Sequence, residues 1–352
     1  IARDHHGYTA INYYIDKDII AFSSSIKSLL ALKNIPKKLN ERKLIRILVV
    51  WPGNDDQSYY KDILILHPAN TLEVNRDSFE KKRYWFPENI QLNPGKKLED
   101  YTSEFYTILN QAINDRMRSY KPVASMLSGG LDSGTVSYLA AELLKSDGKK
   151  LTTYSHVPLY EASTKIPKSR FGDEKPYMEA TVEASGNINP VYLDSKNISP
   201  LDGILKYIEM MDGPIHAACN AYWITDVISS SANDGFGTLL TGEHGNATIS
   251  FSGLEYLLPW KHIYNRAGIK KAVKQKILRP VAYKHLGFVS EYVKRMKGSK
   301  LTDYAYINHH YAKKIRLDSL MKESGHDSTF SFHFEDSKEY LLKILQPGAN
   351  LR

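Results

Sequence analysis

The stretch Val123-Ala124-Ser125-Met126-Leu127-Ser128-Gly129-Gly130-Leu131-Asp132-Ser133 decides the fold. Its first five residues are small or apolar and predict a buried strand over 123–127, and the glycine-rich turn leads into a helix expected over 133–145. A second strand is predicted over 151–157. Strand, helix and strand in that order predict a parallel sheet with a right-handed crossover, and therefore an α/β fold.

Further along the chain the alternation continues. Two more helix and strand pairs are predicted: helix 173–184 with strand 190–193, and helix 222–231 with strand 238–240. Beyond residue 254 the pattern is helical and basic, with a dense run of Lys and Arg over 261–300. That run is interpreted as either a solvated helical face or a docking surface.

The amino-terminal part shows a different sequence pattern. Short strands such as 8–15 and 63–66 are separated by turns, which predicts a mostly β region. A polar break ends at Pro94-Gly95, and apolar residues at helical spacing follow from Tyr101 to Ile113. We therefore expect two domains, over 1–95 and 96–352.

Composition narrows the class of protein. Hydrophobic residues make up 42% of the 352 residues, and 24 Tyr with 4 Trp are far more aromatics than disordered chains carry. The sequence contains no apolar run of about 18 residues and no signal-peptide core, so we expect a cytoplasmic protein without a membrane partner. Cys219 is the only cysteine, which excludes an intrachain disulfide and a Cys-based zinc cage. Its apolar neighbours predict a buried side chain.

The net charge of +8 favours an anionic partner, and it does not distinguish a nucleotide from a nucleic acid or an acidic peptide. The turn at 128–133 is more specific. Gly129 and Gly130 allow the backbone to approach a ligand closely, and the following helix presents unpaired N–H groups, so an oxyanion fits there. Asp132 would repel that anion unless a cation bridged them, which suggests Mg²⁺. Ser128 and Ser133 add hydroxyl donors or cap the helix.

A simple helix cap is the alternative for a bare Gly-Gly-x-x-Ser pattern. The full string Ser128 to Ser133 contains no lysine, so it is not the phosphate loop of enzymes that transfer a γ-phosphate. It resembles the pyrophosphate loop of ATP pyrophosphatases, which cleave ATP between the α- and β-phosphates. The resemblance implies ATP as the nucleotide and an adenylated carboxylate as the intermediate.

A second loop narrows the family. The stretch 239–246, Leu-Leu-Thr-Gly-Glu-His-Gly-Asn, resembles the Ser-Gly-Glu-Gly-Ser-Asp-Glu loop of asparagine synthetases. Segment 170–177 resembles the place where that family's substrate-domain helices begin. Three amino-terminal segments look like the later part of its glutaminase-type domain: 2–7, 22–30 and 83–85.

The resemblance covers about residues 1 to 253. It implies a partial, mostly β, Ntn-hydrolase-like glutaminase domain over 1–95. It also implies an asparagine-synthetase-like ATP-pyrophosphatase domain over 96–352, of the adenine nucleotide α-hydrolase type and incomplete at its C-terminus. The activity implied is an ATP-dependent carbon–nitrogen ligase that forms AMP and pyrophosphate.

Three departures from the family pattern matter. No amino-terminal Cys is present, so glutaminase activity is not assigned. Asn246 and Ala247 stand where the family has a second metal-binding Asp and a Glu, and an Asn carbonyl binds Mg²⁺ more weakly than a carboxylate. The chain ends at Arg352, before the helices that hold the family's acid/base residue. The resemblance therefore implies incompleteness at both ends.

Carried over residue by residue, the family pattern implies the following roles. Asp132 and Glu243 are catalytic, and Asp132 and Asn246 bind the metal. The expected ATP-binding residues are Leu127, Ser128, Gly129, Gly130, Leu131, Asp132, Ser133, His156, Thr241 and Gly242. His156 is expected to contribute a backbone contact only, because a lone His at a strand end is more often half-buried than catalytic. For Glu243 the alternative is a helix-capping carboxylate.

Substrate class is the open question. The stretches 245–250 and 214–223 look like the macrolactam-forming branch that closes lasso peptides, in which a precursor peptide's α-amine attacks its own activated Asp or Glu side chain. We favour that branch over a plain asparagine synthase, which would use aspartate as the carboxylate and ammonia as the amine donor. The alternatives of another class are an inactive ATP-binding scaffold and a tRNA-modifying ATP pyrophosphatase. A nucleic-acid partner is disfavoured by the Thr241-Gly242-Glu243 loop.

Overall fold

The computed structural model describes residues 1–49, 56–75, 78–86, 89–91, 95–161, 171–214, 218–247, 249–250, 260–278, 307–317 and 319–320. Contacts group the chain into two compact units. One contains Ile1–Pro94 with Asp212–Pro214 and the described part of Ile277–Arg352, and the other contains Gly95–Met211 and Ile215–Lys276.

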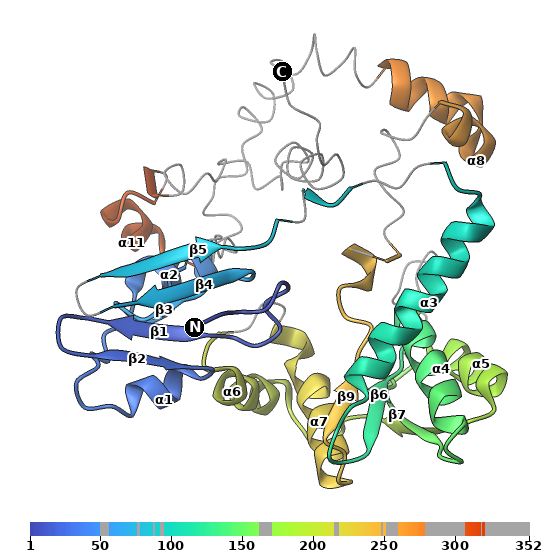
Figure 1. Ribbon diagram of the computed structural model, residues 1–352, viewed down its shortest axis with the longest axis horizontal. Coiled ribbons are helices and arrows are strands. Elements are labelled where there is room, and N and C mark those ends of the chain that lie inside the picture. Colours follow the sequence, from blue (N-terminus) through green and yellow to red (C-terminus); the bar gives the residue numbers. More distant parts are fainter. Residues whose placement is uncertain are drawn as a thin grey trace. The chain divides into compact units, whose positions relative to one another are not determined.

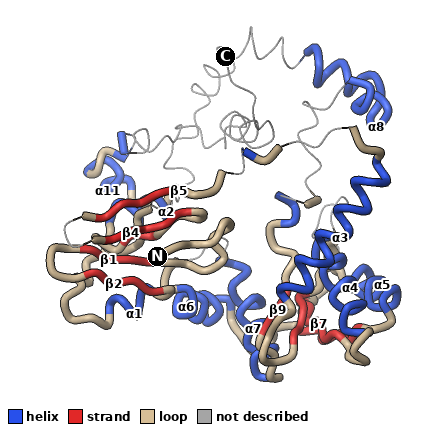
Figure 2. The backbone as a smooth tube through the Cα atoms, in the orientation of Figure 1, coloured by secondary structure: helices blue, strands red, loops and turns tan. Residues whose placement is uncertain are grey.

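A four-stranded parallel sheet forms the centre of the second unit (Figures 1 and 2). It consists of β6 (Val123–Met126), β7 (Leu151–His156), β8 (Ile188–Leu193) and β9 (Thr238–Leu240), in the spatial order β8-β7-β6-β9. Central strand β6 pairs in parallel with β7 on one side and with β9 on the other. The sheet confirms the predicted α/β fold class.

Helices cover both faces of this sheet (Figure 1). On one face α3 (Leu98–Arg116), α4 (Leu131–Lys145) and α5 (Lys175–Ser185) share a core with Val123. On the other face α7 (Ala221–Asn233) packs on a separate core that includes Ala124. Neighbouring residues of a strand point to opposite faces, so the apolar run 123–127 is buried on both sides.

Helix α6 (Pro200–Met211) was not predicted from the sequence. It packs against α7, where a side chain at Gly203 would overlap the backbone of Tyr222. The short 3₁₀ helix Ala218–Asn220 leads into α7 and contains Cys219, whose side chain is exposed. The prediction of a buried cysteine was therefore wrong, because this apolar stretch forms a surface turn and contributes nothing to the core.

Antiparallel strands form the first unit. Strands β2 (Ile20–Ser23), β1 (Asn12–Ile15) and β3 (Leu64–Ile65) lie in that order, and β4 (Asn70–Val74) pairs with β5 (Phe79–Arg83) in a hairpin. Tyr13 and Tyr14 enter two different apolar clusters because they point to opposite faces of β1. The antiparallel strands agree with the predicted β-rich region.

Two helices in this unit were not anticipated, α1 (Ile26–Leu30) and α2 (Glu41–Leu48). Strand β1 also begins at Asn12, four residues later than predicted. The chain before it is organised by Arg3, whose guanidinium donates to the carbonyls of Thr9, Leu66 and Gly7 over 2.6–2.9 Å. Those bonds hold residues 3–9 in a loop and give Arg3 a structural role.

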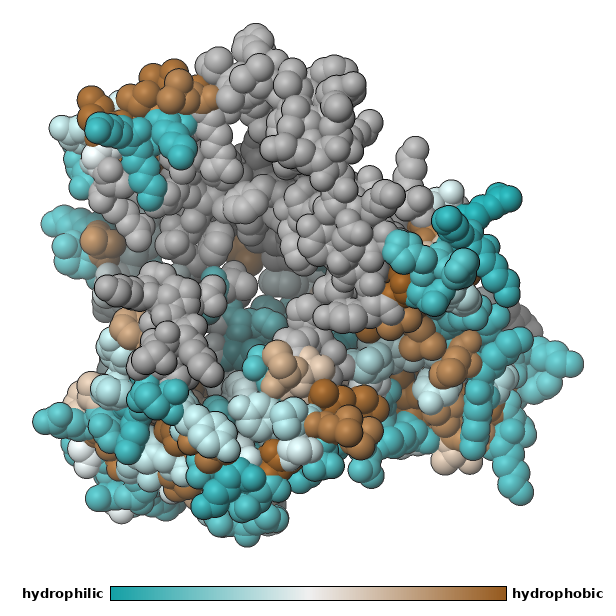
Figure 3. Space-filling view, turned by 180° about the vertical axis from the view of Figure 1, so that it is seen from behind, coloured by the Kyte–Doolittle hydropathy of each residue, from teal (hydrophilic) through white to brown (hydrophobic). Residues whose placement is uncertain are grey.

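The remaining described elements are the 3₁₀ helix Gly245–Ala247, α8 (Trp260–Val273), the π-helix Lys274–Leu278 and α11 (His309–Lys314). Among the helices of the described part of the chain, none combines the length and apolar character that a bilayer crossing requires. Hydrophobic side chains reach the surface in several separate areas (Figure 3). Residues 279–300 of the basic run, with Arg170, 215–217 and Thr248, lie outside the described residues.

Candidate functional site

Sheet order places two loops next to each other. The chain steps from β6 outward to β7 and β8, then returns to lay β9 on the other side of β6, with Ser125 opposite Leu240. Ligands of open parallel sheets bind at such a reversal, beyond the carboxyl ends of the strands. The predicted loops 128–133 and 241–246 follow β6 and β9 there.

Internal hydrogen bonds shape the first loop. Ser133 is 7% exposed, and its hydroxyl accepts the Ser128 backbone N–H at 3.0 Å and lies 2.7 Å from the Ser128 hydroxyl. Gly130 N–H donates to the Ser128 hydroxyl at 3.3 Å. This network curls the backbone over the start of α4, whose first N–H groups have no partner in their own helix. The loop is therefore organised around backbone donors.

The second loop closes against the first through two glycines. A Cβ on Gly242 would lie 2.5 Å from the Ser133 backbone nitrogen, and one on Gly245 would overlap the carboxyl carbon of Asp132. Only hydrogen fits at either position. Gly242 and Gly245 thus let the β9 loop approach the first turn of α4 at backbone distance.

Asp132 and Asn246 come together at one hydroxyl. Ser250 Oγ lies 3.0 Å from Asp132 Oδ2 and 3.3 Å from Asn246 Oδ1, so its single proton is shared between the two oxygens. The Asp132 carboxylate and the Asn246 amide oxygen are therefore neighbours through one hydroxyl group. The predicted pair of metal ligands is brought together, and Ser250 is a member that the sequence analysis did not assign.

Oxygen donors of this kind fit Mg²⁺, which prefers one or two carboxylate or carbonyl oxygens and keeps several further ligands for substrate phosphates and water. In the described residues no group of three or more His, Cys, Asp or Glu side chains could form an all-protein cage. A site built from Asp132 and Asn246 would therefore depend on the nucleotide to complete its ligands.

Glu174 also reaches the loop, and sequence reasoning missed it. Its Oε2 accepts the Gly129 backbone N–H at 3.0 Å, from the residue before α5. A Cβ on Gly129 would lie 2.9 Å from Glu174 Cβ, so glycine is needed for this approach. A carboxylate of the chain thus binds one of the backbone donors expected to hold an anion. The segment that carries Glu174 was singled out by resemblance, but no role was assigned to the residue.

His156 lies at the end of β7, beside the first loop's strand. Its ring stacks on Trp223 with centroids 5.6 Å apart and meets Tyr222 edge-on, while Ser195 Oγ lies 3.4 Å from Nδ1. Burial lowers the pKa of His156 below 6.5, so the neutral ring is favoured. The aromatic packing accounts for the position of the side chain, and the backbone contact with a nucleotide stays a prediction.

The other predicted residues are placed as follows. Leu127 is buried, and its N–H donates to Tyr154 O at 3.0 Å, which extends the pairing of β6 with β7. Leu131 is 83% exposed at the start of α4. Thr241 Oγ1 accepts the Glu243 N–H at 3.4 Å, and the Glu243 carboxylate is exposed, 3.9 Å from His244 Nε2. Glu243 and His244 thus form the outer turn of the β9 loop.

Comparison with known families gives two matches. Residues 104–306, more than half of the chain, match the family described as asparagine synthase. Residues 1–85 match the family described as glutamine amidotransferase domain. The first match contains both loops of the site.

Individual relatives agree with the family match. The chain is 33% identical over 184 residues to a putative glutamine-hydrolysing asparagine synthetase 2 of Methanocaldococcus jannaschii, which covers 52% of this chain and 33% of the relative. It is 29% identical over 189 residues to asparagine synthetase 3 of Bacillus subtilis, covering 53% and 30%. A third similar protein is amidase chyE of Penicillium rubens, 25% identical over 163 residues, covering 45% and 23%. The chain spans about a third or less of the length of these curated relatives.

Proposed function

Because the chain belongs to the asparagine synthase family, we propose that it is an ATP-dependent carbon–nitrogen ligase that adenylates a carboxylate and passes the acyl group to an amine. A carboxylate oxygen attacks the α-phosphorus of ATP, the bond to the β-phosphate breaks, and pyrophosphate leaves. The amine nitrogen then attacks the acyl carbon, loses a proton and expels AMP. Domain limits of 1–95 and 96–352 form part of the same proposal.

One observation carries this proposal: the loop Ser128–Ser133 and the loop that holds Asn246 meet at the strand reversal, with Asp132 next to Gly245. An anion can be held by the first loop's backbone while an oxygen ligand pair lies beside it. That combination suits a leaving group whose negative charge grows as the bond breaks.

Each part of the site has a role in the proposed reaction. Backbone N–H groups of Gly129, Gly130 and the first turn of α4 hold the departing pyrophosphate oxygens. The backbone at Leu127, His156 and Thr241-Gly242 contacts the adenosine, and Glu243 faces the reacting carbon. Proximity of the amine and the activated acyl group supplies the rest of the acceleration.

Magnesium would be held by Asp132 and Asn246, and when bound it would neutralise charge on the pyrophosphate as it leaves. Ser250, which contacts both oxygens, would orient them. The family match is consistent with ATP as the nucleotide.

For the substrate we propose a peptide that closes to a macrolactam, with its own α-amine attacking an activated Asp or Glu side chain. Support comes from the stretches 245–250 and 214–223, which resemble that branch. The rival is aspartate amidation, as suggested by relatives whose names describe glutamine-hydrolysing asparagine synthetases.

Product analysis tests the reaction. The chain is incubated with ATP, Mg²⁺ and either aspartate plus ammonium or a linear peptide with a free amino terminus and one internal Asp. Chromatography should detect AMP and pyrophosphate with one of these carboxylates, and the Asp132→Asn variant should lose most of that activity. ADP and phosphate as products would contradict the proposal, and so would an undiminished rate in the variant.

Mass spectrometry of the same reactions separates the two substrates. A peptide product lighter by one water, with no free α-amine, supports the macrolactam. Asparagine formed from aspartate, with the peptide untouched, would replace that proposal by asparagine synthesis. ATP binding by calorimetry without any AMP from either substrate would favour the inactive scaffold.

A further inference from the structure

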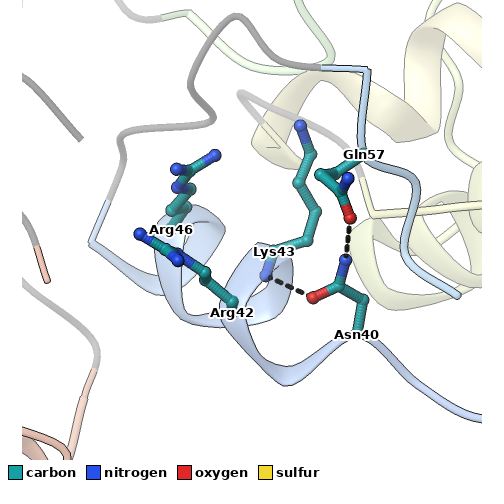
Figure 4. Close-up of a pocket in the computed structure, with 5 residues that line it drawn as sticks. All are labelled: Asn40, Arg42, Lys43, Arg46 and Gln57. Atoms are coloured by element: carbon teal, nitrogen blue, oxygen red, sulfur yellow. Dashed lines mark hydrogen bonds between the residues drawn. The ribbon is translucent and has the colours of Figure 1, made fainter. Parts of the chain in front are cut away.

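A cavity in the first unit is lined by described residues that have no role in the proposed reaction. Its volume is about 410 Å³, and the described residues that line it are Asn40, Arg42, Lys43, Arg46 and Gln57. Figure 4 shows the three cationic side chains leaving the first turns of α2, with the Asn40 and Gln57 carboxamides bonded to each other beside them. The volume falls within the range of about 300–1,000 Å³ found for small-molecule sites.

Helical spacing gathers the three positive charges. Arg42 and Arg46 are four residues apart and Lys43 and Arg46 three apart, so all three lie on one side of α2. Like charges at these spacings repel each other. The described part of the lining therefore carries three positive charges and no negative one.

Burial makes this arrangement unlike an ordinary basic surface. Lys43 and Arg46 are each 8% exposed, whereas Arg42 is exposed at the rim. Charged side chains buried in the wall of a cavity are poorly hydrated. Because the effective dielectric constant around them is lower than in water, they attract an anion more strongly. Surface lysines of the same chain, such as Lys17 with 88% of its side chain exposed, lack that advantage.

The polar frame of the cavity is fixed by the fold. Asn40 Oδ1 accepts the Lys43 backbone N–H at 3.2 Å and caps α2, and Asn40 Nδ2 donates to Gln57 Oε1 at 3.1 Å. The cap places the first turn of α2 relative to Gln57. A ligand would therefore meet a wall that is already formed.

We propose that this cavity binds a small multivalent oxyanion, of the phosphate or carboxylate class. The cationic side chains also make contacts within the protein. An arginine has five N–H donors and a lysine three, so a ligand can share these groups with those contacts. Arginine forks match two oxygens of a phosphate or carboxylate at once, which favours these ligands over chloride.

Calorimetry on the full chain tests the site, with inorganic phosphate and citrate as separate probes at constant ionic strength. Saturable binding of at least one probe is expected, and the stronger probe identifies the class. Arg42→Gln should weaken binding of that probe about tenfold, because it removes one of the three positive charges of the lining. Since Arg42 is exposed at the rim, this substitution should not disturb the core. Lys43→Gln and Arg46→Gln should weaken binding at least as much.

The matched control is Lys17→Gln, which removes the same charge from an exposed turn. Its affinity should equal that of the unchanged chain. Binding that persists undiminished in Arg42→Gln, an equal loss in Lys17→Gln, or no saturable binding of either probe would each overturn the proposal. Thermal unfolding shows whether the Lys43 and Arg46 variants remain folded, and if they do not, Arg42→Gln decides.

Discussion

Glu174 Oε2 accepts the backbone N–H of Gly129 at 3.0 Å, so a carboxylate of the chain lies on a donor of the anion-binding loop. Any phosphate oxygen that binds this N–H must displace it. Two anions at one donor also repel each other. The contact therefore opposes nucleotide binding unless a cation lies between the two groups.

Replacing this carboxylate tests that competition. Glu174→Gln keeps the size of the side chain but removes its charge, and we expect ATP to bind several-fold more tightly, measured by calorimetry with Mg²⁺ present. Glu179→Gln, on the exposed surface of α5, is the matched control and should leave the affinity unchanged. Weaker ATP binding by Glu174→Gln would instead indicate that the carboxylate assists the nucleotide, for example through the metal.

Gly245 offers a test of the contact between the two loops. In Gly245→Ala the new methyl group overlaps the carboxyl of Asp132, so the carboxylate or the β9 loop must shift. We expect at least a tenfold loss of ATP-dependent activity with little change in the unfolding temperature. The control is Gly134→Ala within α4. Its new methyl group would lie 3.5 Å from Thr181 Oγ1, an ordinary contact, so this variant should keep full activity. Equal activity in both variants would show that the loop contact has no role.

The amide at position 246 should affect how much Mg²⁺ the reaction requires. Asn246→Asp supplies a second carboxylate beside Asp132, and carboxylates bind Mg²⁺ more tightly than amide oxygens do. The Mg²⁺ concentration for half-maximal activity should therefore fall several-fold. Asn233→Asp adds the same charge at an exposed position of α7 and should not change it. An unchanged Mg²⁺ requirement in Asn246→Asp would place the metal elsewhere.

Ser133 supports the loop structurally. Its buried hydroxyl accepts the Ser128 N–H, so Ser133→Ala leaves that donor without its partner. A loss of about 1–3 kcal/mol in unfolding free energy is expected, seen as a lower denaturant midpoint. Ser146→Ala removes an exposed hydroxyl that donates to Leu143 O, and it should cost less. Equal losses would argue against the buried network.

His156 predicts a pH effect on stability. Its folded-state pKa is lowered below 6.5 by burial, so the unfolded chain takes up a proton before the folded chain does. The stability that depends on the neutral ring is present above pH 6.5 and is lost as the pH falls from 6.5 toward the folded pKa. We expect the unfolding temperature to drop more between about pH 7.5 and 5.5 in the unchanged chain than in His156→Gln. The exposed His6→Gln variant should behave like the unchanged chain.

Much of the parallel sheet could be predicted because its central strand β6 consists of small and apolar residues and the glycine turn that follows is distinctive. Strand β9 was predicted with its observed bounds, and β6 and β7 each end one residue before the predicted limit. Helix α4 begins at Leu131, two residues before the prediction, because the turn winds directly into the helix. The local sequence pattern predicts such strands well when both of their faces are buried.

Contacts between segments that are distant in sequence could not be predicted from the local sequence pattern. Glu174 and Ser250 reach the loop from 45 and 118 residues away from their partners, and nothing in their own neighbourhoods shows it. Helix α6 was missed although its apolar residues recur at helical spacing, and several remain exposed, namely Leu201, Leu205, Met210 and Met211.

The position of β9 has a consequence for how the protein acquires its site. Residues Ser125 and Leu240, 115 positions apart, must meet before the two loops can approach each other. Closing so long an interval is entropically slow. Until it happens, one side of β6 presents unpaired backbone groups to any neighbouring chain. A truncation before Thr238 should therefore produce aggregates, even though every residue of the first loop would still be present.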